Sequence, residues 1–268
     1  MYNKKVAKIF MTNIHPTAII SPTANLGENV SIGAYSIIED DVTIGDNTKI
    51  GNYSLIGART IMGKNNKIHN AAILGTIPQD MKYKGESSKT IIGDNNTIRE
   101  FVTINVGTGE NGITIIGNNN LLLSYCHIAH DDVLENNIVI SNVVQLAGHV
   151  KVENNVVFGG CGAVHQFCTI GKFSMIAANA IITQDVPPFS LIDRVPAFHS
   201  INKVGLTRNG FSEELRREIN DFYILVFKSG YNNSAGIKKY LETKPNGIEP
   251  EIQYIIDFIN KSERGVIR

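Results

Sequence analysis

The chain has 268 residues, 43% of them hydrophobic, and its 25 basic and 25 acidic side chains give a formal net charge of zero. This length and composition allow one large domain with a full hydrophobic core and a second, smaller one. The balanced charge argues against general binding to nucleic acid, and the absence of a long apolar stretch argues against membrane insertion, so we expect a cytoplasmic protein that acts on small molecules.

The first residues differ from the regular part of the chain that follows them. Residues 1–10 include three lysines but no apolar run of the length that a signal peptide requires. Met11 directly precedes the lead-in to the first repeat. We therefore expect residues 1–13 to be an N-terminal extension, in which residues 1–10 are an alternative start or a non-native addition.

A ladder of large apolar residues with a spacing of six runs from Ile14 to Ile182 and is interrupted at two places. Its members are Ile14, Ile20, Leu26, Ile32, Ile38, Ile44, Ile50, Ile56, Met62, Ile68, Leu74, Ile92, Ile98, Ile104, Ile116, Leu122, Ile128, Leu134, Ile140, Leu146, Val152, Phe158, Val164, Ile170, Ile176 and Ile182. Such a period matches neither an α-helix nor a single strand, so it indicates a repeating unit. Mostly small residues stand two positions before the ladder residues, and two inward side chains at this spacing are what a short strand contributes. Each hexad is therefore predicted to form a short strand followed by a corner, where frequent glycines give the backbone room.

Asparagines indicate how many hexads complete one coil. They recur eighteen residues apart in two groups, Asn29, Asn47 and Asn65, then Asn119, Asn137 and Asn155. Apart from glycine, asparagine is the residue best suited to a left-handed (αL) turn, so this spacing predicts three hexads per triangular coil. We expect a mainly β fold over residues 14–190, a parallel β-helix of hexapeptide repeats whose period resembles that of the left-handed family. A β-sandwich of short strands would instead show a period of two and variable loops.

Both interruptions of the ladder are candidate functional loops. The first covers Gly75–Glu86 and is polar, with proline and glycine among its residues, which is typical of a loop extruded from the coil. The second covers Asn105–Asn111. Loops on a rigid scaffold often carry functional residues. Asp80 and Lys82 in the first loop are therefore candidates for substrate contacts.

Two adjacent prolines end the repeats, and residues 191–268 are predicted to form a small C-terminal α-helical domain. Ser212 is a suitable N-cap for a helix that ends near Gly230. A second helix is expected at about 234–243, and Pro250 is expected to open a third. The apolar faces of these helices need a partner, for which the open last coil is the simplest choice.

Four of the seven histidines are expected to gather on one edge of the β-helix, namely His127, His130, His149 and His165. Residues eighteen apart lie on neighbouring coils, about 4.8 Å from each other. His130 therefore shares one column with Gly148 and Gln166. Asp131 shares the next column with His149. None of these histidines occupies a ladder position, so their side chains are expected to point away from the core.

Three kinds of function could use this cluster. His130 could act as a general base, with Asp131 or another carboxylate orienting it and the Gly148 amide polarising a carbonyl, which are the parts that acyl transfer needs. Alternatively, the histidines bind zinc, as in the carbonic anhydrases built on this kind of fold. Those enzymes draw ligands from two neighbouring subunits, however, and no acid or thiol clearly completes a site here. A purely structural or ice-binding coil would show regular outward threonines and no clustered histidines.

Five segments of the chain, in this order, resemble one known family: Ile77–Tyr83, Cys126–Asp131, Leu146–Val150, Ala163–Cys168 and Gln184–Pro188. The family is that of the UDP-N-acetylglucosamine O-acyltransferases, the first acyltransferases of lipid A biosynthesis, in the hexapeptide-repeat superfamily. The resemblance extends from Ile14 to Arg268. It implies transfer of a (3R)-3-hydroxyacyl group from acyl carrier protein to the 3-hydroxyl of UDP-N-acetylglucosamine, in a homotrimer with active sites in clefts between adjacent coils.

The resemblance also implies roles for individual residues. His130 matches the family's general base, Asp131 its partner, and the Gly148 amide the group at the carbonyl oxygen. Positions that line the sugar-nucleotide or acyl pocket are matched by Asp80, Lys82, His127, His149, His165 and Gln166. Arg208 matches a basic residue near the phosphopantetheine arm of the donor, and Ala178 matches the position that limits acyl-chain length. The resemblance implies no metal, and no cofactor other than the phosphopantetheine on acyl carrier protein.

Some positions depart from the family's pattern. Asn105 and Val106 stand where His-Arg is common, Asp193–Pro196 stands where Gly-Asn-His is common, and Asn209 replaces a second arginine beside Arg208. Because of these departures, the sequence does not determine the contacts to the nucleotide. It does not determine the length of the donor's acyl chain either. One alternative is therefore an N-acyltransferase, acting on a 3-amino or other amino sugar nucleotide or following in the same pathway. A zinc-dependent, carbonic anhydrase-like enzyme is a more distant alternative.

Overall fold

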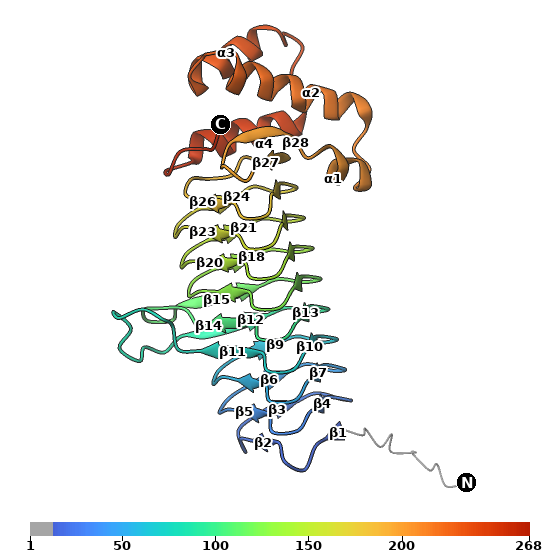
Figure 1. The fold of residues 1–268 in the computed structure, drawn as a ribbon, viewed down its shortest axis with the longest axis vertical. Coiled ribbons are helices and arrows are strands. Elements are labelled where there is room, and N and C mark those ends of the chain that lie inside the picture. The colour runs from blue at the N-terminus through green and yellow to red at the C-terminus, as the bar shows by residue number, and fades with distance from the viewer. Residues whose placement is uncertain (1–12) are drawn as a thin grey trace, which may run out of the picture.

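The computed structural model describes residues 13–268, whose short strands stack into a long column with helices over one end (Figure 1). The strands form three sheets, one on each side of a triangular coil. The N-terminal extension predicted for residues 1–13 lies outside the described residues, apart from Asn13 in the first strand.

The bounds of the strands are as follows. The first sheet contains β1 (Asn13–Ile14), β4 (Ser31–Ile32), β7 (Lys49–Ile50), β10 (Lys67–Ile68), β13 (Thr97–Ile98), β16 (Leu121–Leu122), β19 (Val139–Ile140), β22 (Val157–Phe158), β25 (Met175–Ile176), β27 (Ser190–Ile192) and β28 (Phe198–Ile201). The second sheet contains β2 (Ile19–Ile20), β5 (Ile37–Ile38), β8 (Leu55–Ile56), β11 (Ile73–Thr76), β14 (Thr103–Asn105), β17 (His127–Ile128), β20 (Gln145–Leu146), β23 (Ala163–Val164) and β26 (Ile181–Ile182). The third sheet contains β3 (Asn25–Leu26), β6 (Thr43–Ile44), β9 (Ile61–Met62), β12 (Lys89–Ile92), β15 (Ile113–Ile116), β18 (Val133–Leu134), β21 (Lys151–Val152) and β24 (Thr169–Ile170).

Each strand pairs in parallel with the strand one coil further along the chain. Ile19 of β2 lies beside Ile37 of β5, and His127 of β17 lies beside Gln145 of β20, so one regular coil takes eighteen residues. Only β27 and β28 pair in antiparallel fashion among the described strands. The predicted left-handed parallel β-helix with three hexads per coil is confirmed.

The predicted ladder residues form the core of the β-helix, where nearly all of those after the first coils are fully buried. Buried polar side chains next to the ladder bond the coils to one another. The side-chain oxygens of Asn66 and Asn96 accept the N–H groups of Asn96 and Asn120 at 2.8 and 2.9 Å, and that of Asn120 accepts the N–H of Ile138 at 2.8 Å. These bonds satisfy polar groups that would otherwise destabilise the core.

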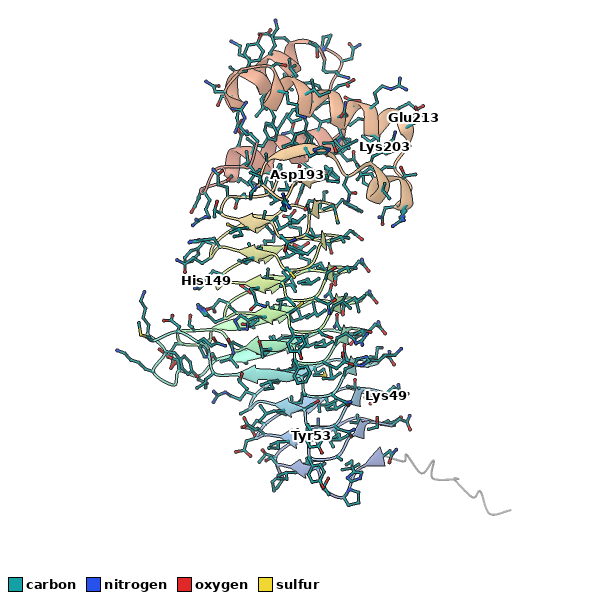
Figure 2. The ribbon with its side chains drawn as sticks, in the orientation of Figure 1. Lys49, Tyr53, His149, Asp193, Lys203 and Glu213 are labelled. Carbon is teal, nitrogen blue, oxygen red and sulfur yellow. The ribbon has the colours of Figure 1, made fainter. Side chains whose placement is uncertain are left out.

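The corners of the coil adopt the αL conformation that the asparagines predict. Asn29 and Asn47, for example, have φ values of 56° and 59°. The structure also places less suitable residues in this conformation, among them Tyr53 at 57° and Val143 at 65° (Figure 2 labels Tyr53). Each αL residue other than asparagine or glycine destabilises its corner by about 1–2 kcal/mol, but a bond between coils offsets this, as where the Tyr53 N–H donates to the Ala34 carbonyl at 2.9 Å.

Glycines beside the ladder meet the neighbouring coil at close range. A Cβ atom at Gly27 would lie 2.4 Å from the side chain of Asp46, and one at Gly33 would lie 2.4 Å from that of Asn52. Neither glycine has a positive φ angle. The room that glycine provides is therefore used by the adjacent coil, and the turn itself is made by the αL residue two positions later.

Both predicted loops leave the column at the corner between the second and third sheets. Residues 77–88 connect β11 to β12, and residues 106–112 connect β14 to β15. In Figure 1 they form the excursion at the side of the column. The side chain of Asn105 donates to the Ile77 carbonyl at 3.0 Å, so the two loops are tied together at their bases.

The helical region contains α1 (Lys203–Arg208), α2 (Glu213–Tyr223), α3 (Asn233–Glu242) and α4 (Pro250–Lys261), and α2 continues into a π-helical turn, η1 (Ile224–Lys228). Ser212 is the N-cap of α2 as predicted, because its hydroxyl accepts the N–H of Leu215 at 3.1 Å. Pro250 opens α4, also as predicted. The sequence pattern does not predict α1, since six residues are too few to show a helical period.

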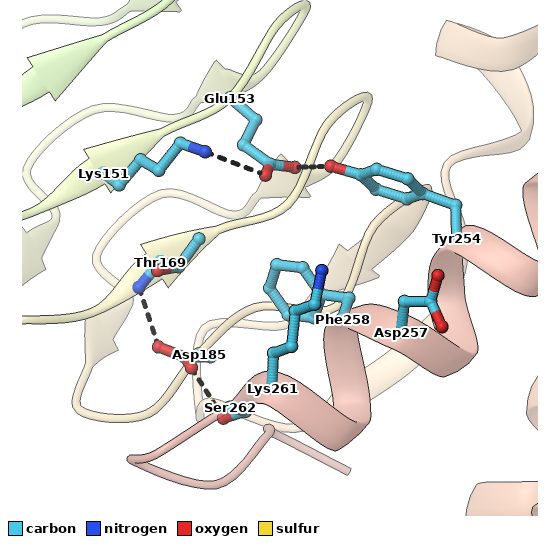
Figure 3. A pocket seen from close by; sticks show the side chains of 9 residues that line it. All are labelled: Lys151, Glu153, Thr169, Asp185, Tyr254, Asp257, Phe258, Lys261 and Ser262. Atoms are coloured by element: carbon cyan, nitrogen blue, oxygen red, sulfur yellow. Dashed lines mark hydrogen bonds and ion pairs between the residues drawn. The ribbon is translucent and has the colours of Figure 1, made fainter.

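Helix α4 joins the helical region to the last coils, as expected from its apolar face. Its buried isoleucines share a core with Phe189 from the end of the column. Beside this core, the Tyr254 hydroxyl donates to Glu153 at 2.7 Å, and the Ser262 hydroxyl donates to Asp185 at 2.6 Å (Figure 3). Within residues 13–268, no helix has the length and apolar character needed to cross a membrane.

Candidate active site

A cleft of about 690 Å³ opens at the corner where both loops leave the column. It is lined by Gln79, Asp80, Met81, Lys82, Asn105, His127, Ala129, His130, Gln145, Leu146, Ala147, Gly148, His149, Ala163, Val164, Gln166 and Phe167. Most of the residues that the sequence singles out therefore meet in one place. Figure 2 labels His149 on this edge, nearer the helical end than the loop excursion.

His130 and Asp131 form a hydrogen-bonded pair beside the cleft. Nδ1 of His130 lies 2.9 Å from Oδ2 of Asp131, and both side chains are largely shielded from solvent. Because an ionised carboxylate only accepts hydrogen bonds, this contact holds the proton on Nδ1 and leaves Nε2 free to accept one. His130 can therefore act as a general base at the cleft.

Thr108, in the second loop, holds Asp131 in place. Its hydroxyl donates to Oδ2 of Asp131 at 2.6 Å, and its N–H lies 3.1 and 3.0 Å from the two carboxylate oxygens. The N–H of Asp131 in turn donates to the hydroxyl of Thr114 at 2.9 Å. Thr108 is not among the residues predicted from sequence, although it lies within the second interruption of the ladder.

Gly148 lies directly against the ring of His130. A Cβ atom at this position would lie 2.6 Å from Nε2 of His130, so a larger residue would displace the imidazole. The N–H of Gly148 makes no hydrogen bond with any described residue. It is therefore available to donate to an oxygen atom placed next to His130.

The other histidines differ in their surroundings. Nδ1 of His127 lies 2.7 Å from the hydroxyl of Thr103, and burial lowers the pKa of His127 below its ordinary value, as does the charge that His130 can carry. His149 stacks on Phe167 at 4.7 Å and stands edge-on to His130 at 5.1 Å. His165 is exposed and does not line the cleft, unlike its neighbour in sequence Gln166.

Asp80 and Lys82 reach the cleft from the first loop. The N–H of Lys82 donates to Oδ1 of Asp80 at 2.9 Å, which forms a tight local turn. The side chain of Lys82 is exposed and forms no ion pair with any described residue. Its charge is therefore free to meet an anionic ligand.

Ala178 and Arg208, like His165, lie outside the cleft of a single chain. Ala178 is exposed at the corner between the first and second sheets, where the next residue, Asn179, donates its N–H to the Gly160 carbonyl at 2.9 Å. Arg208 is exposed at the end of α1. One chain does not bring either residue to His130.

The zinc alternative can be tested on the donor atoms themselves. His130, Asp131 and His149 offer ligand atoms within 4.8 Å of one another. Oδ2 of Asp131, however, already accepts hydrogen bonds from Nδ1 of His130 and from the N–H and hydroxyl of Thr108. A metal ion would have to displace these donors, so the cluster does not fit a preformed metal site.

Comparisons with known proteins place these features in one family. Residues 185–267 match the model described as UDP-N-acetylglucosamine O-acyltransferase, domain 2, and residues 23–58 match the bacterial transferase hexapeptide model. The chain is 45% identical to the acyl-[acyl-carrier-protein]–UDP-N-acetylglucosamine O-acyltransferase of Herminiimonas arsenicoxydans, over 96% of this chain and 100% of that protein. It is 46% identical to the enzyme of the same name from Alkalilimnicola ehrlichii, with the same coverage. The solved UDP-N-acetylglucosamine acyltransferase of Bacteroides fragilis is 42% identical, with a TM-score of 0.92 over 95% of this chain and 99% of that one.

Proposed function

This chain belongs to the family of acyl-[acyl-carrier-protein]–UDP-N-acetylglucosamine O-acyltransferases, and from this premise we propose how its cleft works. The enzyme transfers a (3R)-3-hydroxyacyl group from acyl carrier protein to the 3-hydroxyl of UDP-N-acetylglucosamine, the first step of lipid A biosynthesis. The observation that carries this proposal is the His130–Asp131 pair, which faces the unpaired N–H of Gly148. A base and an oxyanion donor on one edge are the parts that acyl transfer requires.

The reaction follows from these three residues. Nε2 of His130 takes the proton of the sugar hydroxyl as its oxygen attacks the thioester carbonyl carbon. The N–H of Gly148 donates to the carbonyl oxygen as negative charge develops on it, and Asp131 stabilises the imidazolium. When the carbon–sulfur bond breaks, the leaving thiolate takes the proton from His130, which yields the ester and the free thiol of the carrier.

The remaining cleft residues hold the substrates. Lys82 supplies a mobile positive charge suited to the diphosphate of the sugar nucleotide, and Asp80 fixes the turn that carries it. Further contacts to the sugar nucleotide or acyl group come from His127, His149 and Gln166 in the cleft, and from His165, which lies outside the cleft lining of a single chain. The only cofactor is the phosphopantetheine of the donor, with Arg208 near it. The proposed reaction needs no metal, and we propose that the enzyme works in the cytoplasm.

We propose that the enzyme is a homotrimer. An apolar stripe lies over the second sheet and the corner before it, formed by Ile19, Tyr35, Ile37, Tyr53, Ile73, Phe101, Tyr125 and Val143, all of them exposed. Within the stripe, Tyr35 stacks on Tyr53 and Phe101 stacks on Tyr125, and exposed apolar residues grouped in this way mark an interface. Ala178 and Arg208 lie away from the cleft of their own chain, so their roles require that a neighbouring copy supplies them.

An acylation assay tests the proposed reaction. Purified protein is supplied with 3-hydroxyacyl thioesters of acyl carrier protein and with two sugar nucleotides, one carrying a 3-hydroxyl and the other a 3-amino group. We expect ester formation on the 3-hydroxy substrate and no loss of activity in a chelator. Amide formation on the 3-amino substrate alone would identify an N-acyltransferase, and activity that depends on zinc would favour the carbonic anhydrase-like alternative.

A further inference from the structure

One amide next to the catalytic turn departs from the regular bonding between coils. The first residue after a strand of the second sheet normally donates its N–H to a carbonyl of the next coil. Such bonds join Glu39 to Ile56 at 2.9 Å, Ala147 to Val164 at 3.0 Å and His165 to Ile182 at 2.8 Å. Ala129, which precedes His130, is the exception, because its N–H donates to Oδ2 of Asp132 at 3.0 Å. The carbonyl of Leu146, which lines the cleft, is left without this donor.

Asp132 connects the two turns that hold the proposed reacting groups. Its side chain is fully buried, and its second oxygen, Oδ1, accepts the N–H of Val150 at 2.8 Å. One carboxylate thus bonds the turn of His130 and also the segment that follows Gly148. Burial raises the pKa of Asp132 well above its ordinary value, although the N–H groups of Val150 and Ala129 act in the opposite direction. The carboxyl forms no ion pair with any described residue.

An ordinary stacking role does not explain why this residue is an acid. Asn120 also bonds its side-chain oxygen to the next coil, at the N–H of Ile138, but its NH₂ group donates to the Glu135 carbonyl at 3.0 Å. The regular bond between coils survives there, from the Gly117 N–H to the Leu134 carbonyl at 2.7 Å. Asparagine is therefore sufficient for stacking. At position 132 the two N–H groups reach different oxygens of the side chain, and the NH₂ group of an asparagine could not accept either of them.

We propose that Asp132 is a positioning residue for acyl transfer. By accepting the N–H of Ala129, it keeps this one amide from bonding to the Leu146 carbonyl, while the His130 carbonyl still accepts the N–H of His149 at 3.0 Å, and so it sets the spacing between the His130 ring and the Gly148 amide. This inference rests on the proposed function, because the spacing matters only if both groups act on one acyl carbonyl. Small displacements of such groups lower turnover strongly, since the reacting atoms must meet in a narrow range of geometry.

The test exchanges acid and amide at two equivalent places. Asp132→Asn keeps an acceptor for Val150 but loses the bond to Ala129, and asparagine already occupies such positions at Asn66, Asn96 and Asn120. We expect a folded protein with unchanged KM for the sugar nucleotide and a kcat lowered by about 10- to 100-fold. The control is Asn120→Asp, which loses the bond to Glu135 at a corner away from His130. It should lower the melting temperature and leave kcat unchanged.

The two kinds of failure are distinguishable. A normal kcat in Asp132→Asn would overturn the role of Asp132. So would a decrease in kcat that, in both Asp132→Asn and Asn120→Asp, merely matches the fraction of protein that is no longer folded. If the asparagine variant does not fold, Asp132→Ser replaces it, because Ser36 and Ser54 are tolerated next to the ladder. A wild-type protein that forms no ester would instead refute the proposed function, before any variant is compared.

Discussion

His130 depends on neighbours from different coils, and each of them controls one atom of the imidazole or of its partner. Asp131 accepts a hydrogen bond from the N–H at Nδ1, and Thr108 in the second loop holds Asp131. Gly148, one coil further along, leaves room beside Nε2. The proposed base is therefore oriented by groups that do not themselves exchange a proton with the substrate.

Removing the base should abolish most activity without affecting the fold. His130 points away from the core, so His130→Ala opens no cavity in the ladder, and kcat should fall by about 10²- to 10⁴-fold while the circular dichroism spectrum is retained. His15→Ala makes the same change at an exposed site in the first coil and should have no effect. Unchanged turnover in His130→Ala would transfer the role of base to His127 or His149.

The charge of Lys82 should act on binding rather than on chemistry. Lys82→Ala is expected to raise KM for the sugar nucleotide more than it lowers kcat, with a smaller effect at high salt. Lys84→Ala removes the same charge from the same loop, but Lys84 does not line the cleft. If both variants have the same KM, or if neither differs from wild type, Lys82 is an ordinary solvated side chain.

At the scale of elements, the contact between α4 and the column joins two cores. The residue Glu153 is only 6% exposed, and its carboxylate accepts hydrogen bonds from the Tyr254 hydroxyl at 2.7 Å and from the Lys172 N–H at 3.0 Å. The ammonium of Lys172 also lies 3.6 Å from the centre of the Tyr254 ring. A helix and two corners of the column are thus fixed by one buried acid, whose bond with Tyr254 is drawn in Figure 3.

Loss of the hydroxyl at this junction should lower stability. Tyr254→Phe leaves the buried carboxylate of Glu153 with one donor fewer, so the free energy of unfolding should fall by about 1.5–3 kcal/mol while kcat is retained. Tyr240→Phe is the matched control, since its hydroxyl donates to Glu218 at 2.9 Å within the helical region. Equal stability of Tyr254→Phe and wild type in urea would show that solvent replaces the bond.

At the scale of the whole molecule, assembly is expected to follow from the apolar stripe. Light scattering should give three times the chain mass of 29.4 kDa. Phe101→Asp introduces a charge into the stripe and should produce monomers that are folded but inactive. Ile61→Asp places the same charge on the third sheet, outside the stripe, and should leave the trimer intact. A stable, active wild-type monomer would contradict the proposed assembly.

Acyl-chain preference should likewise depend on assembly. In the proposed trimer, alanine at position 178 is expected to leave the acyl groove nearly open. Each further CH₂ buried there contributes about 0.8 kcal/mol, so wild type should prefer long donors until the chain meets a wall. Ala178→Met should shift the preference to shorter chains in a series of acyl carrier protein donors. Ala34→Met, at the same corner near the other end of the column, should not. An unchanged preferred length in Ala178→Met would exclude Ala178 as the limiting residue.

Much of this protein is determined by local repetition. A period of six sets the direction of each side chain, and a coil of eighteen residues stacks His130, Gly148 and Gln166 in one column without any long-range information. The αL corner residues other than asparagine could not be identified from this repetition. Residues such as Val143 adopt αL only because bonds to the neighbouring coil hold them there.

The two loops break this regularity, and only the tertiary structure determines their conformations and contacts. Thr108 meets Asp131, and Asn105 meets Ile77, at separations that no period predicts. The bond from the Ala129 N–H to Asp132, which replaces a regular bond between coils, likewise could be found only in the tertiary structure. Periodicity dictates where a repeated side chain points, because each coil rests on an equivalent one. A loop has no equivalent beneath it, so its conformation follows from the contacts that it makes after folding.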